Sequence, residues 1–392
     1  MEYELRTWDS VRALGEANYR ALEQPSTPPF LTFDWLDALE VTGCVVPDRG
    51  WMPMHLTLHR DQRLVACAPA YVKGNSEGEF VFDHAWARFC EGSLGLPYYP
   101  KLLFGVPFTP ATGPKLLVRP GESPEELYPV FAAAIRRLSA EAGVSGAHVL
   151  FSPENEAQAL ADAGLARRLG VQFHWHNDRY ESFDHFLSRF NAKRRHQIKR
   201  ERREVAAQGV DVSVKTGREL TPTLADFVYA FYRNTVDKFV WGRRYLKREF
   251  FEEVLSRMAS RLHVVVAADR ASGAPLAGAF NLLGEDALYG RYWGALEERS
   301  FLHFEVCFYK GIEEAIERRL LRFEPGAGGE HKIARGFEPS LTYSMHHLVD
   351  RRLDHAVRDF LGREEAAVHS EVATARAEMG MKPSKKVIGS RG

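Results

Sequence analysis

The order of predicted secondary-structure elements occurs twice along this chain, about 200 residues apart. In the first half, an alternating hairpin at 54–73 leads to a strand at 99–108, an amphipathic helix at 123–143 and a buried strand at 147–152. Hairpin, strand, long helix and strand follow again between 262 and 326. Such repetition indicates two copies of one α/β fold. No residue-level identity links the halves, so the ordinary alternation of any α/β protein stays the alternative.

Composition restricts the class of protein further. The 392 residues are 45% hydrophobic, which is typical of a globular chain with room for two or three domains. Lys and Arg number 52, and Asp and Glu also number 52, so the formal net charge is zero. A surface that is positive all over and binds nucleic acid or membrane everywhere is therefore excluded. Any polyanion must bind to a local patch of positive charge.

The cysteines are four, far apart, and form no CxxC pair, which argues against a zinc knuckle or a disulfide framework. No HExxH spacing occurs either, so we expect no metal site. The N-terminal residues lack a basic region followed by an apolar core, and the apolar runs are too short to cross a bilayer. We expect a cytoplasmic protein with no integral membrane segment.

The segment 191–205 concentrates positive charge, since seven of its fifteen residues are Lys or Arg. Asn191 can cap a helix that stops at Gly209. Two acids, Glu201 and Glu204, cannot neutralise seven bases. The pattern predicts a contact with phosphates; a salt-bridged, solvated face is the alternative. No helix-turn-helix or zinc-finger pattern accompanies it, so DNA is not expected as a partner.

The segment 323–339 follows a predicted strand and places three of its four glycines directly before a run of charged residues. Glycines let backbone amides approach a ligand, and the neighbouring titratable groups can bind it or exchange protons. It is not a Walker loop, because no GK[ST] follows. A tight turn with exposed charges is the alternative. The residues concerned are Gly326, Gly328, Gly329, Glu330, His331, Lys332 and Arg335.

A third candidate segment, 288–305, runs from a strand into a helix that we expect Ser300 to cap. Arg291 and Trp293 share one face of the strand by their spacing. His303 and Glu305 lie in the first turns of the helix, where the helix dipole favours anions. The alternative is that Trp293 and Tyr292 are core residues and that His303 is a surface histidine with its hydrogen bonds satisfied.

Several strings together resemble the bacterial FemAB-like proteins, a branch of the GNAT superfamily of N-acyltransferases. The resemblance runs from about residue 28 to about residue 365. The strings are FLTFDWLDALE, LPYYPKLL, VPFTPATGP, KRRHQIKRERREV, LYGRYWG, LHFEVCFYKGIEEAIERRL, GGEHKIARGFEP and TYSMHH.

This resemblance implies a fold, α/β (α+β), with two tandem GNAT-like halves. We place them at 1–180 and 181–350, followed by a C-terminal helix and a flexible basic tail at 351–392. It also implies transfer of an acyl or aminoacyl group to an amine, the acceptor being a cell-wall precursor or another small molecule. The donor is a co-substrate, acyl-CoA or aminoacyl-tRNA, and no cofactor is held tightly. The glycine loop that cradles the pyrophosphate of CoA in ordinary GNAT enzymes is absent from "GALEERSFLHFE".

Site roles follow from the resemblance and the segments above. We expect His331 as general base and Arg335 as an anion clamp, with Glu330 and Glu305 as the other catalytic candidates. The helix bases would bind the phosphates of the donor, including those of tRNA. A non-catalytic GNAT-fold module that binds a cell-wall or nucleotide ligand is the alternative function. The expected binding residues are Lys193, Arg194, Arg195, Lys199, Arg203, Arg291, Trp293, His303, Lys332 and Tyr343.

Overall fold

The computed structural model describes residues 3–238 and 243–381, except for the side chain of Glu330. The predicted basic tail, from residue 382 onward, lies outside the described residues. Strands of the larger sheet are β2 (Trp51–Pro53), β5 (Ala70–Lys73), β6 (Lys101–Phe104), β8 (Gly146–Ser152), β9 (Ala166–His176), β10 (Val210–Thr216), β11 (Leu262–Asp269), β12 (Pro275–Leu283), β13 (Ala287–Ala295), β14 (Arg322–Glu324) and β15 (Glu338–Leu348). Strands of the smaller sheet are β1 (Glu4–Trp8), β3 (His55–Arg60), β4 (Arg63–Ala68) and β7 (Leu117–Val118).

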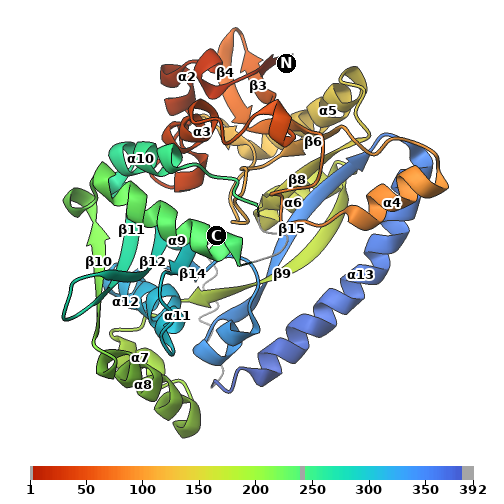
Figure 1. Cartoon of the computed structure of the whole chain (residues 1–392). Helices are drawn as coiled ribbons and strands as arrows, with labels where there is room; N and C mark the ends of the chain where they lie inside the picture. Colours follow the sequence, from red (N-terminus) through yellow and green to blue (C-terminus); the bar gives the residue numbers. More distant parts are fainter. Residues whose placement is uncertain (1–2, 239–242, 382–392) are drawn as a thin grey trace.

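Helices cover both faces of these sheets (Figure 1). The α-helices are α1 (Val11–Leu14), α2 (Glu16–Arg20), α3 (Phe33–Val41), α4 (His84–Ser93), α5 (Pro124–Glu141), α6 (Glu154–Asp162), α7 (Phe183–Leu187), α8 (Ala192–Ala207), α9 (Ala225–Asp237), α10 (Arg248–Arg257), α11 (Leu302–Phe304), α12 (Lys310–Glu317) and α13 (Arg351–Glu378). The segment η6 (Glu305–Tyr309) is a π-helix. Short 3-10 helices are η1 (Pro29–Leu31), η2 (Pro47–Arg49), η3 (Gly217–Glu219), η4 (Pro222–Leu224), η5 (Ala259–Arg261) and η7 (Glu330–Arg335).

Locally coded elements form as predicted. The hairpin of β3 and β4 turns at Asp61 and Gln62, and the Ser123 side chain caps α5. Asn191 caps α8 by accepting from the backbone N–H of Arg194. The predicted cap at Ser300 is wrong: α11 begins at Leu302, after Phe301 in a left-handed conformation with φ 62°. The π-helix then replaces the expected regular helix.

The two halves share one sheet of eleven strands, ordered β10-β11-β12-β13-β14-β9-β15-β8-β6-β5-β2. Strand β15, from the second half of the sequence, lies between β9 and β8 of the first half (Figure 1). Its register pairs His346 with His148 and Met345 with Val149. The mixed α/β class is confirmed. The sheet itself does not divide near residue 180, and the domain boundaries stay a prediction.

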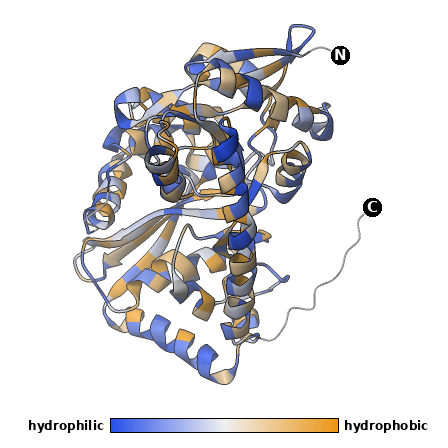
Figure 2. Ribbon diagram, turned by 90° about the vertical axis from the view of Figure 1, so that its right-hand side faces the viewer, coloured by the Kyte–Doolittle hydropathy of each residue, from blue (hydrophilic) through white to orange (hydrophobic). Residues whose placement is uncertain are grey.

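A common hydrophobic core also joins the halves. Trp35 of α3 packs edge-on against Phe250 of α10 at 5.0 Å between ring centroids, and Phe30 packs in the same way on Tyr289 of β13. Such aromatic contacts bury much apolar area and favour one arrangement of the two halves. In contrast, α8, at the lower end of the molecule, is largely hydrophilic (Figure 2), with only Ile198, Glu201 and Val205 buried.

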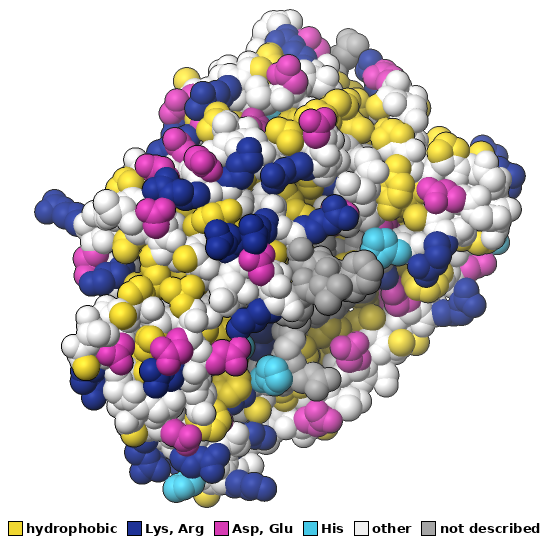
Figure 3. All heavy atoms as spheres, in the orientation of Figure 1, with side chains coloured by type: hydrophobic (Ala, Val, Ile, Leu, Met, Phe, Trp, Pro, Cys, Tyr) yellow, Lys and Arg dark blue, Asp and Glu magenta, His cyan; other side chains and the backbone are white. Residues whose placement is uncertain are grey.

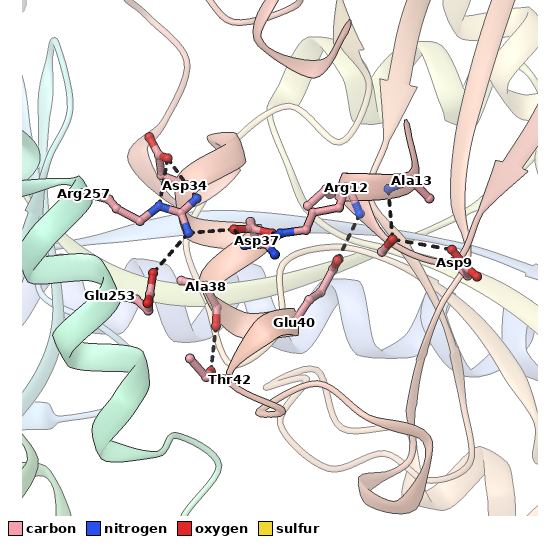
Figure 4. Close-up of polar contacts among 12 residues, drawn as sticks. Asp9, Arg12, Ala13, Asp34, Asp37, Ala38, Glu40, Thr42, Glu253 and Arg257 are labelled. Carbon is pink, nitrogen blue, oxygen red and sulfur yellow. Dashed lines mark hydrogen bonds and ion pairs between the residues drawn. The ribbon is translucent and has the colours of Figure 1, made fainter. Parts of the chain in front are cut away.

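Ion pairs reinforce this contact between α3 and α10 (Figure 4). Arg257 donates to Asp37 at 2.6 Å and to Asp34 at 3.0 Å, and Arg12 also donates to Asp37. Burial raises the pKa of Asp37, but the hydrogen bonds from the two guanidinium groups lower it more, so the net pKa lies below its usual value. The resulting stability is present above the ordinary aspartate pKa and is lost as pH falls through the lowered pKa of Asp37.

The substitution Arg257→Met is expected to lower the free energy of unfolding by about 2 kcal/mol, because it removes charged hydrogen bonds from two partly or fully buried carboxylates. The control Arg248→Met lies on the same helix and breaks only exposed pairs with Asp226 and Glu252, so it should lower the free energy of unfolding much less than Arg257→Met does. Urea denaturation at pH 7 measures both values. Equal values for the two variants would contradict a stabilising role for Arg257.

Candidate functional site

A cavity of about 350 Å³ lies between β12, β13, the helical segment at 303–308 and the glycine-rich loop. We call it the loop cavity. Polar and aromatic side chains point to a ligand site here rather than to core packing. The side chains that matter below are those of Asn281, Arg291, Trp293, His303, His331 and Lys332.

Glycines explain why the loop can approach β13. A Cβ on Gly290 would lie 3.0 Å from the Cα of Pro325, too close for an ordinary contact. Gly326, Gly328 and Gly329 have φ values of 91°, 73° and 98°, which other L-residues rarely adopt. The loop therefore brings its backbone beside the strand and directs the following residues into the cavity.

Lys332 is the buried cation of the loop cavity. It is 4% exposed, and its ammonium group donates to the carbonyl of Gly326 at 2.5 Å. Burial lowers the pKa of Lys332 to about 8, while the nearby Cys307 thiol acts in the opposite direction. Lys332 can therefore hold or release a proton close to neutral pH. The sequence placed Lys332 only among the binding residues.

His303 and Trp293 form an aromatic wall, with ring centroids 4.3 Å apart. Burial lowers the pKa of His303 to about 4, and the charges of His331 and Lys332 lower it in the same direction. His303 is therefore neutral at pH 7. His331, the predicted base, also lines the cavity, but its side chain is exposed at the rim. The side chain of Glu330 lies outside the described residues.

Arg335 does not line the loop cavity and is already paired. Its guanidinium donates to Glu201 at 2.9 Å and to the Tyr309 hydroxyl at 3.1 Å, and it stacks 3.2 Å from the Phe304 ring centroid. Both charged side chains are almost fully buried. This geometry contradicts the expectation of a free anion clamp, because a bound anion would have to displace Glu201. The residue instead attaches α8 to the loop.

Glu305 is also engaged elsewhere. Arg202 of α8 binds both of its carboxylate oxygens, at 2.8 and 3.0 Å, and binds Glu313 at 2.6 Å. Glu305 lines a different cavity and does not approach His331 or Lys332 in the loop cavity. Its predicted role as a base is therefore not supported by its position. The sequence alone could not show that a base of α8 would neutralise it.

The outer side of α8 keeps much of its positive charge. Lys199 pairs with the exposed Asp184 at 2.8 Å, and Arg194 bonds to Gln197. Among the described residues, no ion pair involves Lys193, Arg195 or Arg203. A groove of about 740 Å³, the helix groove, is lined by His196, Lys199, Arg202 and Arg203. Figure 3 shows Lys and Arg side chains gathered at the lower tip of the molecule, over α7 and α8.

A second cavity, of about 360 Å³, lies against β9, β15 and α13. We call it the strand cavity. Ala327 and Gly328 line both this cavity and the loop cavity, so the glycine-rich loop separates two adjoining spaces. Predicted residue Tyr343 contributes to the strand cavity. Sequence reasoning missed Arg168, Thr342 and Ser344, although the alternating polar residues at 342–346 carry a signal of one polar strand face.

Two further properties follow from the described ranges. No group of three or more His, Cys, Asp or Glu side chains is placed there to hold a metal ion. Within the same residues, no helix combines the length and the apolar character needed to span a membrane.

Solved structures of other proteins align with nearly the whole of this fold. The crystal structure of FemX aligns at 12% identity and a TM-score of 0.53, covering 91% of this chain and 100% of that one. A tandem GNAT protein from the clavulanic acid biosynthesis pathway aligns at 12% identity with a TM-score of 0.45, covering 89% and 99%. At this low sequence identity, the likeness to FemX shows a shared fold only.

Sequence comparisons give the family. Curated protein sequences give no significant match. The FemAB-like family model, described as peptidoglycan biosynthesis/recognition, matches residues 6–383, which is nearly the whole chain. The chain therefore belongs to the FemAB-like family.

Proposed function

We propose that this protein is an N-acyltransferase that moves an acyl or aminoacyl group from an activated donor to an amine of a cell-wall precursor. The observation that carries the proposal is the position of Lys332. A buried amine with a pKa of about 8 lines one of two cavities that adjoin at the glycine-rich loop. Two adjoining spaces suit two reactants held side by side. Membership of the FemAB-like family supports the cell-wall assignment.

The chemistry requires a proton acceptor but no covalent enzyme intermediate. The neutral acceptor amine attacks the carbonyl carbon, and the new C–N bond forms as its N–H proton passes to the neutral Lys332 amine. The bond to the leaving thiolate or alkoxide then breaks, and the leaving group takes its electron pair and a proton from Lys332. The residues of the loop at 326–329 line the same cavity, and their backbone N–H groups can donate to the carbonyl oxygen.

The donor carries phosphates whether it is acyl-CoA or aminoacyl-tRNA. The bases of α8 and of the helix groove form a positive surface that the Glu201–Arg335 ion pair links to the glycine-rich loop, so we assign them to donor binding. The two donors differ in the number of phosphates contacted. Affinity for tRNA would fall steeply with salt because each neutralised phosphate releases counterions, whereas a single CoA would show a shallow slope.

Reversing three bases, Lys193, Arg195 and Arg203, to Glu is expected to weaken donor binding at least tenfold and to leave the melting temperature nearly unchanged, since these side chains make no ion pair among the described residues. The matched control reverses three exposed bases elsewhere that likewise make no ion pair among the described residues, Arg88, Arg218 and Arg351. Fluorescence titration with bulk aminoacyl-tRNA and with acetyl-CoA at two salt concentrations gives the affinities. Similar affinities for both triple variants would show that α8 does not bind the donor and is only a solvated, charged helix face.

The activity itself is tested by turnover. Purified protein is incubated with radiolabelled acetyl-CoA or with a pool of labelled aminoacyl-tRNAs, and with a UDP-linked muramyl peptide as acceptor. Mass spectrometry should find one acyl or aminoacyl group added to an amine of the peptide. Saturable binding of donor and peptide without any product, in every combination, would indicate a non-catalytic binding module instead.

A further inference from the structure

A buried hydrogen-bonded chain ends at the wall of the strand cavity. It runs from Asp83, before α4, through Tyr98, His148 of β8 and His346 of β15 to Ser344. All five residues are buried, and Ser344 lines the cavity. Only the pairing of β15 with β8 brings the two imidazoles together, at 2.7 Å between their Nδ1 atoms. The proposed acyl transfer does not use this series of hydrogen bonds.

At the Asp83 end of this series of hydrogen bonds, the carboxylate is ionised and accepts every hydrogen bond that it makes. The Lys101 ammonium group and the Ser76 hydroxyl donate to the Asp83 carboxylate, and these contacts hold the pKa of Asp83 below its usual value although burial raises it. An ionised carboxylate only accepts hydrogen bonds. The Tyr98 hydroxyl, 2.7 Å away, must therefore donate to Asp83.

The direction of this first hydrogen bond determines the direction of each of the following ones. With its only proton given to Asp83, the Tyr98 oxygen accepts from Nε2–H of His148 at 3.4 Å. Burial lowers the pKa of His148 to about 3, so the ring is neutral and its Nδ1 accepts from Nδ1–H of His346. His346 Nε2 is then an acceptor, and the Ser344 hydroxyl, 2.9 Å away, donates to it. The Ser344 proton points inward, and its oxygen lone pairs remain for a ligand.

The remaining wall of the strand cavity suits a cation with an apolar part. Arg168 is paired with Glu364 through two bonds of 2.7 and 2.8 Å, whereas Glu371 is exposed and has no ion pair among the described residues. The three charged side chains thus leave one net negative charge. Phe80, Phe82 and Val368 supply apolar surface beside them.

We propose that the strand cavity binds the amine acceptor, and that Ser344, held by the chain as a hydrogen-bond acceptor, receives an N–H of that amine. His346, His148, Tyr98 and Asp83 are positioning residues that act through Ser344. The assignment of the ligand as the acceptor of acyl transfer rests on the proposed function. It places the amine beside Ala327 and Gly328, where the strand cavity adjoins the loop cavity that Lys332 lines.

The proton arrangement is tested first, by ¹⁵N NMR of the histidine rings in the full chain. Neutral His148 should carry its proton on Nε2 and neutral His346 on Nδ1. Comparison with His148→Gln and His346→Gln spectra assigns the signals. The opposite tautomers, or a protonated ring at pH 7, would overturn the proposal, because Ser344 would then donate rather than accept.

Ligand choice is tested next, without any acyl donor, using n-butylammonium and butan-1-ol as probes. Butylammonium should shift the His346 ring signals saturably, and butan-1-ol should bind at least tenfold more weakly. Ser344→Ala should weaken butylammonium binding about tenfold, and Ser344→Thr should restore it. Equal binding of the two probes, or an unchanged Ser344→Ala, would overturn the proposal. These results do not depend on turnover, so failure of acyl transfer and failure of the acceptor site can be told apart.

Discussion

Replacing Lys332 by Met is expected to lower the rate of acyl transfer by about 10²- to 10⁴-fold, the range typical of a lost general base. The neutral form of Lys332 accepts the amine proton, so the wild-type rate should rise with pH and level off near its pKa of about 8. The variant should lose this limb of the pH–rate profile. Single-turnover kinetics with a labelled donor between pH 6 and 9.5 measure both.

Two controls separate proton transfer from packing. Lys332→Arg keeps a cation in the cavity but cannot release its proton near neutral pH, so it should lose the limb as Lys332→Met does. His331→Gln alters the exposed group that the sequence favoured as base and should keep the wild-type profile. If Lys332→Met kept the pH-dependent rise in rate and His331→Gln lost it, the prediction from the sequence that His331 is the general base would be right.

The substitution Glu201→Ala is expected to lower the free energy of unfolding by about 3–5 kcal/mol. It leaves the Arg335 guanidinium buried without its carboxylate, and removing one partner of a buried ion pair exposes the full desolvation cost of the other. The Tyr309 hydroxyl loses a partner in the same step. Urea denaturation followed by tryptophan fluorescence measures the change.

Variants on the same pair test this explanation. Adding Arg335→Met to Glu201→Ala should recover part of the loss, because no unpaired charge remains buried. Glu204→Ala, one turn along α8 and exposed, should change stability by about 0.5 kcal/mol or less. Should Glu201→Ala behave like Glu204→Ala, Arg335 would be free to bind an anion, as the sequence suggested.

Local signals in the sequence predicted most of the elements. Turn residues located the hairpins, and Ser123 and Asn191 located helix starts, because caps and turns depend on neighbouring residues alone. The start of α11 was misplaced because Phe301 adopts a left-handed conformation that no local preference favours. Family strings supplied the α/β class and the FemAB-like membership.

The candidate site was only partly predictable. The sequence located the glycine-rich loop and kept His331 and Lys332 together, because they are neighbours in the chain. That His303 lines the same cavity was decided by the fold. It could not show that Lys332 is buried while His331 is exposed, since burial depends on how β13 and the π-helix pack against the loop. Burial brings the pKa of Lys332 close to neutral pH. The base proposed from the structure is therefore Lys332, whereas the sequence predicted His331.

The sequence by itself determined the element order, the positive charge of α8 and the glycine-rich loop, all of which depend on residues close together in the chain. Only the tertiary structure decided which charges neutralise one another: Glu201 with Arg335 and Glu305 with Arg202, each more than 100 positions apart. It also decided the pairing of His148 with His346, through the place of β15 between β8 and β9. A register shift of one residue would turn His346 and Ser344 to the opposite face of the sheet, and no local sequence preference specifies that register.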